Sequence, residues 1–167
     1  MKHIKAFESV TKNKFYSLLF DFLKQINPDL YEVKPYTDRN MKSDIIALSF
    51  NIIKQGRNLK MYDSKSDVAF VIKFIPVSDK KERELLSKSK TRIMLDESYG
   101  VEDNTTKDLF NFINDTLIEY SYFYKRTPFW NNKSIADFFI KNSDIEKIMN
   151  YLSNNFEQYI NMKKYNL

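Results

Sequence analysis

Asp29, Glu32 and Lys34 come nearer to a catalytic set than any other residues of this chain. In metal-dependent nucleases, carboxylates hold Mg²⁺ and a lysine helps to activate the attacking water. Those carboxylates usually come from two neighbouring strands, whereas Asp29 and Glu32 follow each other closely along one segment. A helix end followed by an ordinary extended segment accounts for the same residues. A metal-dependent nuclease is therefore the weakest functional alternative, and replacing Glu32 or Lys34 would test it.

The chain lacks the residues on which most other catalytic and cofactor sites depend. It contains one histidine (His3), no cysteine and two glycines, Gly56 and Gly100. Histidine is the usual general base near neutral pH, cysteine is the strong nucleophile, and both are common metal ligands. Two isolated glycines exclude a Walker loop, a dinucleotide-binding fingerprint and the glycine-bearing RNA-recognition strand. We therefore expect no cofactor, no metal site and no enzyme activity.

An acidic segment over residues 96–103 places four carboxylates around Gly100. Oxygen ligands of this kind bind hard cations, but their spacing does not match the alternating ligands of a helix-loop-helix calcium site. A solvated loop explains the segment as well, because negative charge stabilises the N-terminus of the helix expected to follow it. We favour the loop interpretation.

An aromatic and basic segment over residues 119–130 is the clearest candidate for binding a partner. Rings beside basic side chains can anchor a protein interface or stack on bases. If the segment continues a helix, Tyr120, Phe123 and Tyr124 lie on adjoining rows and pack in the core. The residues after that helix are better placed for exposure. We therefore assign partner binding to Arg126, Phe129 and Trp130.

A second set of candidates is basic. The formal net charge is +5, the isoelectric point is near 9.1, and lysine greatly outnumbers arginine. Abundant lysine and asparagine are also what an AT-rich genome produces without selection for binding. A basic hairpin and the basic end of a following helix can nevertheless contact phosphates, and nucleic-acid binding stays open as the main alternative. The residues concerned are Lys54, Arg57, Lys60, Lys88, Lys90 and Arg92.

The elements that position these residues begin with a helix over residues 12–26, where apolar side chains follow helical spacing before Asn27 and Pro28 end it. The pattern then becomes alternating. It predicts a short extended segment over 30–34, strands over 46–52 and 68–74, and a turn at 55–58 followed by extended structure over 59–62. Short turns between successive strands indicate an antiparallel meander.

The second half of the chain is expected to be mainly helical. Capping-box patterns predict a short charged helix over 79–88, a helix that starts near Thr105 and ends before Pro128, and a long final helix that starts near Ser143. Residues 91–96 are apolar enough for a fourth strand, and residues 135–140 are expected to form a short helix.

Taken together, the patterns predict an α+β fold: an N-terminal helix, an antiparallel β-meander of three to four strands, and then a group of about three helices. The 167 residues fit a single α+β domain over residues 1–167, and an aromatic content of 16% supports a dense core. There is no secretory signal pattern and no stretch of about 20 apolar residues, so we expect a cytoplasmic protein, of a cell or of an infected host.

The most plausible function from sequence is that of a non-enzymatic binding protein acting on a partner macromolecule. The expected partner is another protein or a protein–nucleic acid complex, and no membrane is implied. A small, lysine-rich domain without a catalytic set suits an accessory, inhibitor or immunity protein, including one carried by a phage or other mobile element. Nucleic-acid binding and metal-dependent nuclease activity are the alternatives.

Overall fold

Six strands form one antiparallel sheet in the computed structural model of this chain, which describes residues 14–42, 45–53, 68–75, 91–97, 103–128 and 134–165. The spatial order is β1-β2-β3-β4-β6-β5, and each strand is antiparallel to its neighbours. The first four strands therefore form an antiparallel meander, as predicted, although its first strand was expected only as a short extended segment over 30–34. The strands are β1 (Tyr31–Pro35), β2 (Ile46–Ile52), β3 (Val68–Ile75), β4 (Thr91–Asp96), β5 (Ser121–Pro128) and β6 (Ser134–Ile140).

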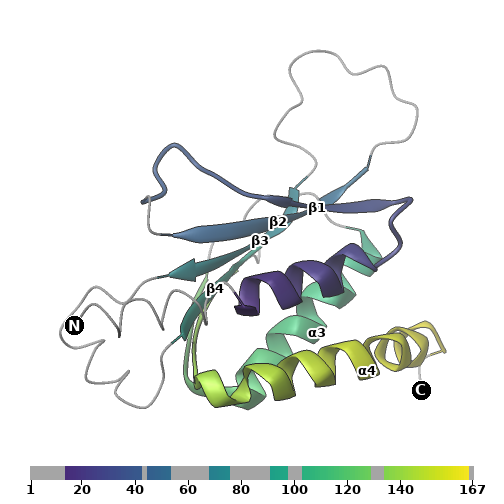
Figure 1. Cartoon of the computed structure of the whole chain (residues 1–167). Helices are drawn as coiled ribbons and strands as arrows, with labels where there is room; N and C mark the ends of the chain where they lie inside the picture. The colour runs from purple at the N-terminus through teal and green to yellow at the C-terminus, as the bar shows by residue number, and fades with distance from the viewer. Residues whose placement is uncertain are drawn as a thin grey trace.

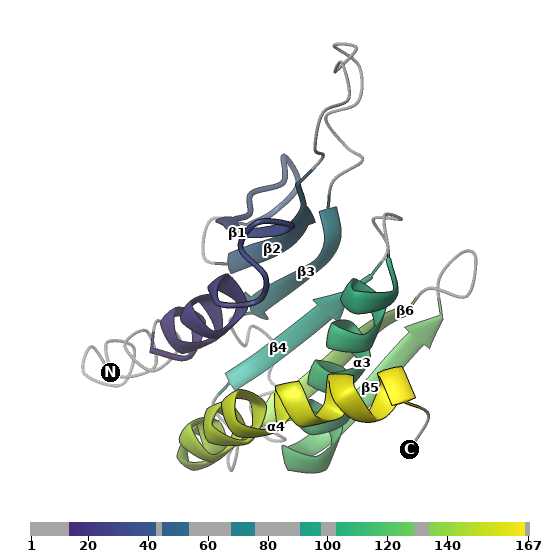
Figure 2. The ribbon, with the colours of Figure 1, turned by 90° about the vertical axis from the view of Figure 1, so that its right-hand side faces the viewer.

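Helices cover one face of this sheet (Figures 1 and 2). They are the N-terminal helix over residues 14–24, α3 (Asn104–Tyr120) and α4 (Ile145–Tyr165), which follows a single 3-10 turn, η2 (Asn142–Asp144). The core between helices and sheet is continuous and rich in phenylalanine. Phe15 of the N-terminal helix meets Phe74 of β3 edge-to-face with ring centroids 5.6 Å apart, and Phe22 meets Phe156 of α4 at 5.9 Å.

The N-terminal helix ends at Lys24, two residues before the predicted Ile26, and a turn at Asn27 follows it. Asn27 adopts a positive φ of 34°, a conformation that asparagine tolerates better than most residues. Its carbonyl oxygen accepts hydrogen bonds from the backbone N–H groups of Leu30 and Tyr31, at 2.9 and 3.0 Å. This turn directs the chain out of the helix and straight into β1.

Asp103 links the start of α3 to β1. Its Oδ1 accepts a 2.7 Å hydrogen bond from the backbone N–H of Thr106, whose Oγ1 in turn accepts one from the backbone N–H of Asp103. The Tyr31 hydroxyl donates to Oδ2 at 2.7 Å. Burial, together with this carboxylate, raises the pKa of the Tyr31 phenol to about 12. The capping box thus starts two residues earlier than the Thr105 predicted from sequence.

The expectation of helices over residues 121–126 and 135–140 is wrong, because both segments are strands. The Ser121 backbone N–H and hydroxyl both bond to the Ile118 carbonyl, which closes α3 at Tyr120. The chain then contains three consecutive aromatic residues followed, after two basic residues, by Thr127 and Pro128, a composition that fits a strand better than a helix. The strand count is therefore higher than predicted, and α3 and α4 are the helices described after the meander.

Several expected elements lie outside the described residues: the turn at 55–58, the extended segment 59–62 and the charged helix 79–88. Within the part of the chain that is described, no helix has the length and apolar character needed to cross a membrane.

Candidate functional site

The face of the sheet that points away from the helices, here called the outer face, carries charged side chains in register across the strands. Cross-strand neighbours place Lys73, Met94, Asp137 and Lys125 in one row that runs from β3 to β5. Side chains on one face of adjacent antiparallel strands are close enough to interact. The register thus decides which charges meet on this face.

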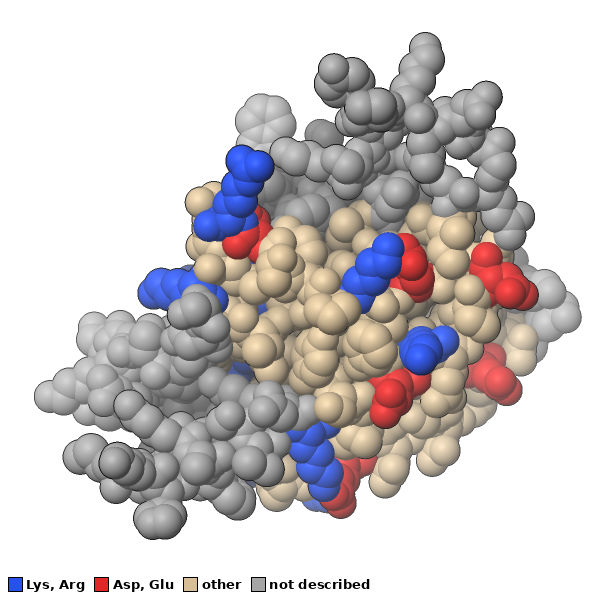
Figure 3. Space-filling view, turned by 45° about the horizontal axis from the view of Figure 1, so that its top comes forward, with Lys and Arg blue, Asp and Glu red and all other residues tan. Residues whose placement is uncertain are grey.

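Most charges on the outer face are paired. Lys73 Nζ lies 3.5 Å from Asp96 Oδ2, and Arg92 Nε donates to Asp137 Oδ1 at 2.9 Å. Figure 3 shows lysine and arginine atoms next to aspartate and glutamate atoms over a surface of other residues. Because Asp96 is 4% exposed, its pairing with Lys73 offsets the cost of burying the carboxylate. This part of the face is therefore electrostatically satisfied.

A second row on the outer face leads to the rim of the sheet. The Arg92 guanidinium lies over the Phe139 ring, 5.6 Å from its centroid. Phe139 in turn meets Phe123 of β5 edge-to-face, with centroids 5.5 Å apart. Phe139 is 5% exposed, whereas Phe123 is 42% exposed. The aromatic row therefore ends in a ring that is open to solvent at the last strand of the sheet.

Among the described strands, β5 is that last one, and it is paired with β6 alone. Six of its eight residues are exposed. We call the exposed side chains of Tyr122, Phe123, Lys125 and Arg126 the β5 edge. An edge strand presents backbone N–H and C=O groups that no strand within the sheet satisfies. The opposite edge, β1, has five residues and ends at Pro35, so it offers a shorter template.

Lys125 is the unpaired charge of the β5 edge. Its cross-strand neighbour is Asp137, but that carboxylate is bound by Arg92. Among the described residues, no carboxylate oxygen lies within ion-pair distance of Lys125. The Arg92–Asp137 pair therefore leaves a basic side chain at the rim available to a ligand.

Arg126, predicted to bind a partner, is more constrained. One of its terminal nitrogens lies 3.9 Å from Glu97 Oε1, and the same oxygen accepts a 2.8 Å hydrogen bond from the Ser134 hydroxyl. The Arg126 side chain is nevertheless 52% exposed. It adds positive charge to the β5 edge while its guanidinium stays close to Glu97, the residue that follows β4. Phe129 and Trp130, predicted with it, lie outside the described residues.

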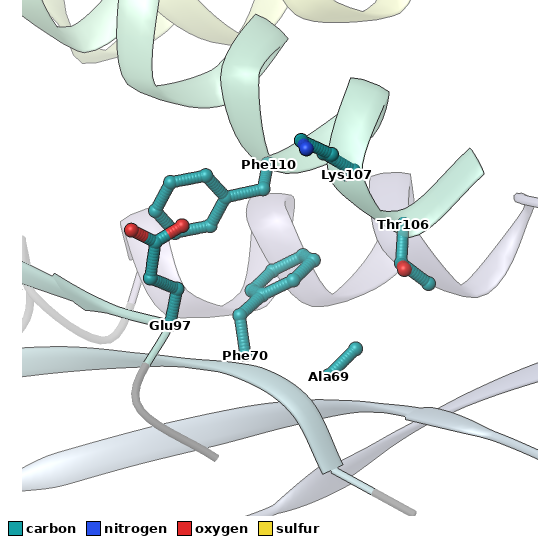
Figure 4. A pocket seen from close by; sticks show the side chains of 6 residues that line it. All are labelled: Ala69, Phe70, Glu97, Thr106, Lys107 and Phe110. Atoms are coloured by element: carbon teal, nitrogen blue, oxygen red, sulfur yellow. The ribbon is translucent and has the colours of Figure 1, made fainter. Parts of the chain in front are cut away.

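A shallow pocket lies beside Glu97, between β3 and the first turns of α3 (Figure 4). The Phe70 and Phe110 rings meet edge-to-face beside it, with centroids 5.8 Å apart, and the Glu97 carboxylate points toward Phe110. Two aromatic rings at van der Waals contact leave little room, so the pocket is a gap in core packing rather than a ligand cavity. Its lining residues are Ala69, Phe70, Glu97, Thr106, Lys107 and Phe110.

Of the three nuclease candidates, Asp29, Glu32 and Lys34, only the last two contact each other. Glu32 and Lys34 form an ion pair with each other on the outer face of β1, with side chains 40% and 58% exposed. Asp29 lies in the exposed turn before that strand. Within the described ranges, no three acidic or histidine side chains are grouped so that they could hold a metal ion. The arrangement is that of a solvated surface pair.

The described carboxylates of the acidic segment 96–103 make separate contacts and do not form one site. Asp96 ends β4 and pairs with Lys73, Glu97 contacts Ser134 and Arg126, and Asp103 caps α3. The residues between Glu97 and Asp103 lie outside the described part of the chain.

The nucleic-acid candidates are described only at Arg92, since Lys54, Arg57, Lys60, Lys88 and Lys90 lie outside the described residues. The Arg92 side chain is 19% exposed, pairs with Asp137 and covers Phe139. A guanidinium held in this way fixes the outer face and orders the residues behind the β5 edge. The basic-hairpin hypothesis stays a prediction.

Tyr122, Phe123 and Lys125 were not assigned to partner binding by the sequence, because the predicted helix placed Phe123 in the core. Phe123 is instead exposed, and Tyr124 is half-buried with its ring stacked on Phe138 at 5.2 Å. The run of aromatic residues before a Thr-Pro pair was the available indication of a strand. Read as a strand, the same residues alternate between the core and the outer face.

No protein-family model, no curated protein and no solved structure matches this chain. The chemistry of its own residues therefore has to carry the functional assignment.

Proposed function

We propose that this chain is a non-enzymatic binding protein that occupies a surface of a partner protein through the β5 edge. The expected setting is the cytoplasm of a cell or infected host, and the expected class is an accessory, inhibitor or immunity protein. The observation that carries the proposal is the combination, on a strand at the edge of the described sheet, of two exposed aromatic rings with a lysine that has no ion-pair partner among the described residues.

The β5 edge has the composition that protein interfaces favour. Tyr122 and Phe123 are 48% and 42% exposed, and Arg126 lies on the same strand. Aromatic and arginine side chains are enriched among the residues that dominate binding energy. Isolated exposed apolar residues are common on protein surfaces, but two consecutive exposed rings on a strand at the edge of the sheet offer apolar area to a partner. A partner that covers this strand buries both rings at once.

The contacts behind Phe123 support the same proposal. The Phe123 ring packs against Phe139, which Arg92 covers from the other side. A ring held in place before binding loses less conformational freedom when a partner covers it. We therefore expect less binding energy to be spent on fixing the Phe123 ring than on fixing a ring without such contacts.

Affinity capture tests the proposal. The bait is the full chain carrying F123A and K125E, compared with wild type and with a control carrying L30A and K24E. The control makes one large-apolar-to-alanine change and one lysine-to-glutamate change at other exposed positions, since Leu30 is 40% exposed and Lys24 ends the N-terminal helix. We expect wild type and control to retain one protein in common from cells that produce the chain, and the β5 variant to lose it.

Two results would contradict the proposal. The first is retention of the same partner by the β5 variant and by wild type. The second is recovery of nucleic acid alone, with binding that weakens steeply as salt rises through counterion release. That second result would support the basic-residue alternative instead.

A further inference from the structure

We infer that the occupant of the β5 edge is an extended acidic segment of the partner protein, which adds to β5 as a further antiparallel or parallel strand. This inference rests on the proposed function and specifies the chemistry of the partner. It follows from the backbone of β5, the charges along it and the order of its outer-face side chains.

The backbone of β5 is the first argument. The strand is eight residues long and pairs with β6 from Ser121 to Pro128, with a register shift between Ser121 and Phe123 and regular pairing from Phe123 onward. In an antiparallel pair only alternate residues direct their N–H and C=O groups toward the neighbour, so the others point to the rim. An extended chain satisfies these groups with main-chain hydrogen bonds, which supply affinity that is independent of its side chains.

The charges along β5 determine which kind of chain can add to it as a strand. β5 contains Lys125 and Arg126 and no acidic residue. A second copy of this chain, paired with β5 antiparallel about a twofold axis, brings the same two cations and no carboxylate, so no register places an opposite charge beside Lys125. Like charges on directly opposed residues are destabilising. A strand that carries carboxylates gains attraction at the same positions.

Lys125 can form an ion pair with such a carboxylate. Its intramolecular neighbour Asp137 is bound by Arg92 at 2.9 Å, and Lys125 has no ion-pair partner among the described residues. A carboxylate on the added strand, opposite Lys125, therefore does not have to displace an existing ion pair. Because Arg92 binds Asp137, the Lys125 ammonium group is left to bind a carboxylate of the ligand.

The outer face also sets the spacing in the ligand. Phe123 and Lys125 are two residues apart and lie on the same face of β5. Their neighbours on an added strand are likewise two residues apart. The ligand is therefore expected to carry an apolar or aromatic residue opposite Phe123 and an aspartate or glutamate two positions away.

A library of random ten-residue peptides, selected on the immobilised full-length protein, tests the inference without knowledge of the natural partner. We expect enriched peptides to contain an acidic residue two positions from an apolar one. K125E is expected to weaken their binding about 2- to 30-fold, because an attraction becomes a repulsion. Changing the peptide's acidic residue to lysine should restore binding to K125E, and K24E is the matched control.

Backbone methylation separates strand addition from other modes of peptide binding. Two versions of the best peptide carry N-methyl groups on opposite alternate residues. Only one version points its methyl groups at β5, so we expect one to lose binding about tenfold or more and the other to keep it. Similar effects of both versions would overturn strand addition.

The remaining outcomes separate the inference from the function on which it rests. If the captured partner is lost with F123A and K125E but no peptide binds, a folded surface occupies the β5 edge and only the inference fails. A dimer of the wild-type chain that K125E strengthens would assign the edge to a second copy. Single-stranded DNA that binds at the β5 edge and is not displaced by peptides would assign it to nucleic acid.

Two controls exclude misfolding as the cause of lost binding. One is K125M, which removes the charge without reversing it, and the other is an unchanged circular dichroism spectrum for each variant.

Discussion

Removing the Asp103 carboxylate should uncouple α3 from β1, and a double-mutant cycle with Tyr31 measures the link. In the folded chain one carboxylate accepts two hydrogen bonds of 2.7 Å, from the Thr106 N–H and from the Tyr31 hydroxyl. The loss of a helix cap costs about 1 kcal/mol, and a hydrogen bond to a charged group contributes about 1.5–3 kcal/mol. D103A is therefore expected to lower the free energy of unfolding by about 2–4 kcal/mol.

The second arm of the cycle isolates the tyrosine contact. Y31F keeps the ring, which is 5% exposed and stacks on Phe50 at 5.3 Å, and removes only the hydroxyl. We expect Y31F alone to cost about 1–2 kcal/mol, and the double variant to cost less than the sum by about the same amount. Urea denaturation of the full chain and the three variants measures all four free energies. Additive effects, within about 0.3 kcal/mol, would refute the link between Asp103 and Tyr31.

The same contact predicts a pH dependence. The pKa of Tyr31 is raised to about 12 in the folded chain, from an ordinary value of 10.0, first by burial and then by Asp103. Below pH 10 the phenol is protonated in both the folded and unfolded chains, so its contribution to stability is complete. Between pH 10 and 12 the unfolded chain releases the proton and the folded chain keeps it, so stability falls as the pH rises. The stability advantage of wild type over Y31F should therefore shrink across this interval.

Three further variants test the sheet. I93V removes one methyl group from a fully buried side chain of β4 and should cost about 0.5–1.5 kcal/mol in a denaturant titration, whereas L30A, on the surface, should cost less. D96N leaves Lys73 without its carboxylate in a site where Asp96 is 4% exposed. It should lower the free energy of unfolding by about 1–3 kcal/mol, between the values for surface and for buried ion pairs. A loss below about 0.3 kcal/mol would contradict the pairing. R92Q frees Asp137 to pair with Lys125, so isothermal titration should show acidic peptides binding the β5 edge up to about fivefold more weakly, and tighter binding would contradict the role given to Arg92.

The meander was predictable because its strands alternate. Leu48 and Phe50 point into the core and Ser49 to the outer face, which is the period of two that a half-buried strand requires. The N-terminal helix and α4 were predictable for the corresponding reason, since their apolar residues follow a period near 3.6. In these elements the local pattern and the tertiary environment agree.

The β5–β6 pair was not predictable in the same way. Phe138 and Phe139 of β6 are both buried, one in the core and one beneath Phe123 and Arg92 on the outer face. A strand buried on both faces has no alternation, so a short apolar run does not distinguish it from a helix. Lys125 was missed as an unpaired charge because the pairing of Asp137 with Arg92 depends on the register of β4 and β6, which local sequence does not contain. The site therefore arises from strand order, whereas its residue types are visible in the sequence.

Amide hydrogen exchange, measured by NMR on the full-length chain alone and with the captured partner, tests most directly whether β5 is the binding surface. In the free chain, alternate amides of β5, those directed away from β6, should exchange rapidly while the others are protected by the β6 ladder. Binding of the partner should protect these outward amides and leave those of β1 unchanged. Outward β5 amides that are already protected in the free chain, or new protection confined to other elements, would contradict the assignment of the β5 edge as the binding surface.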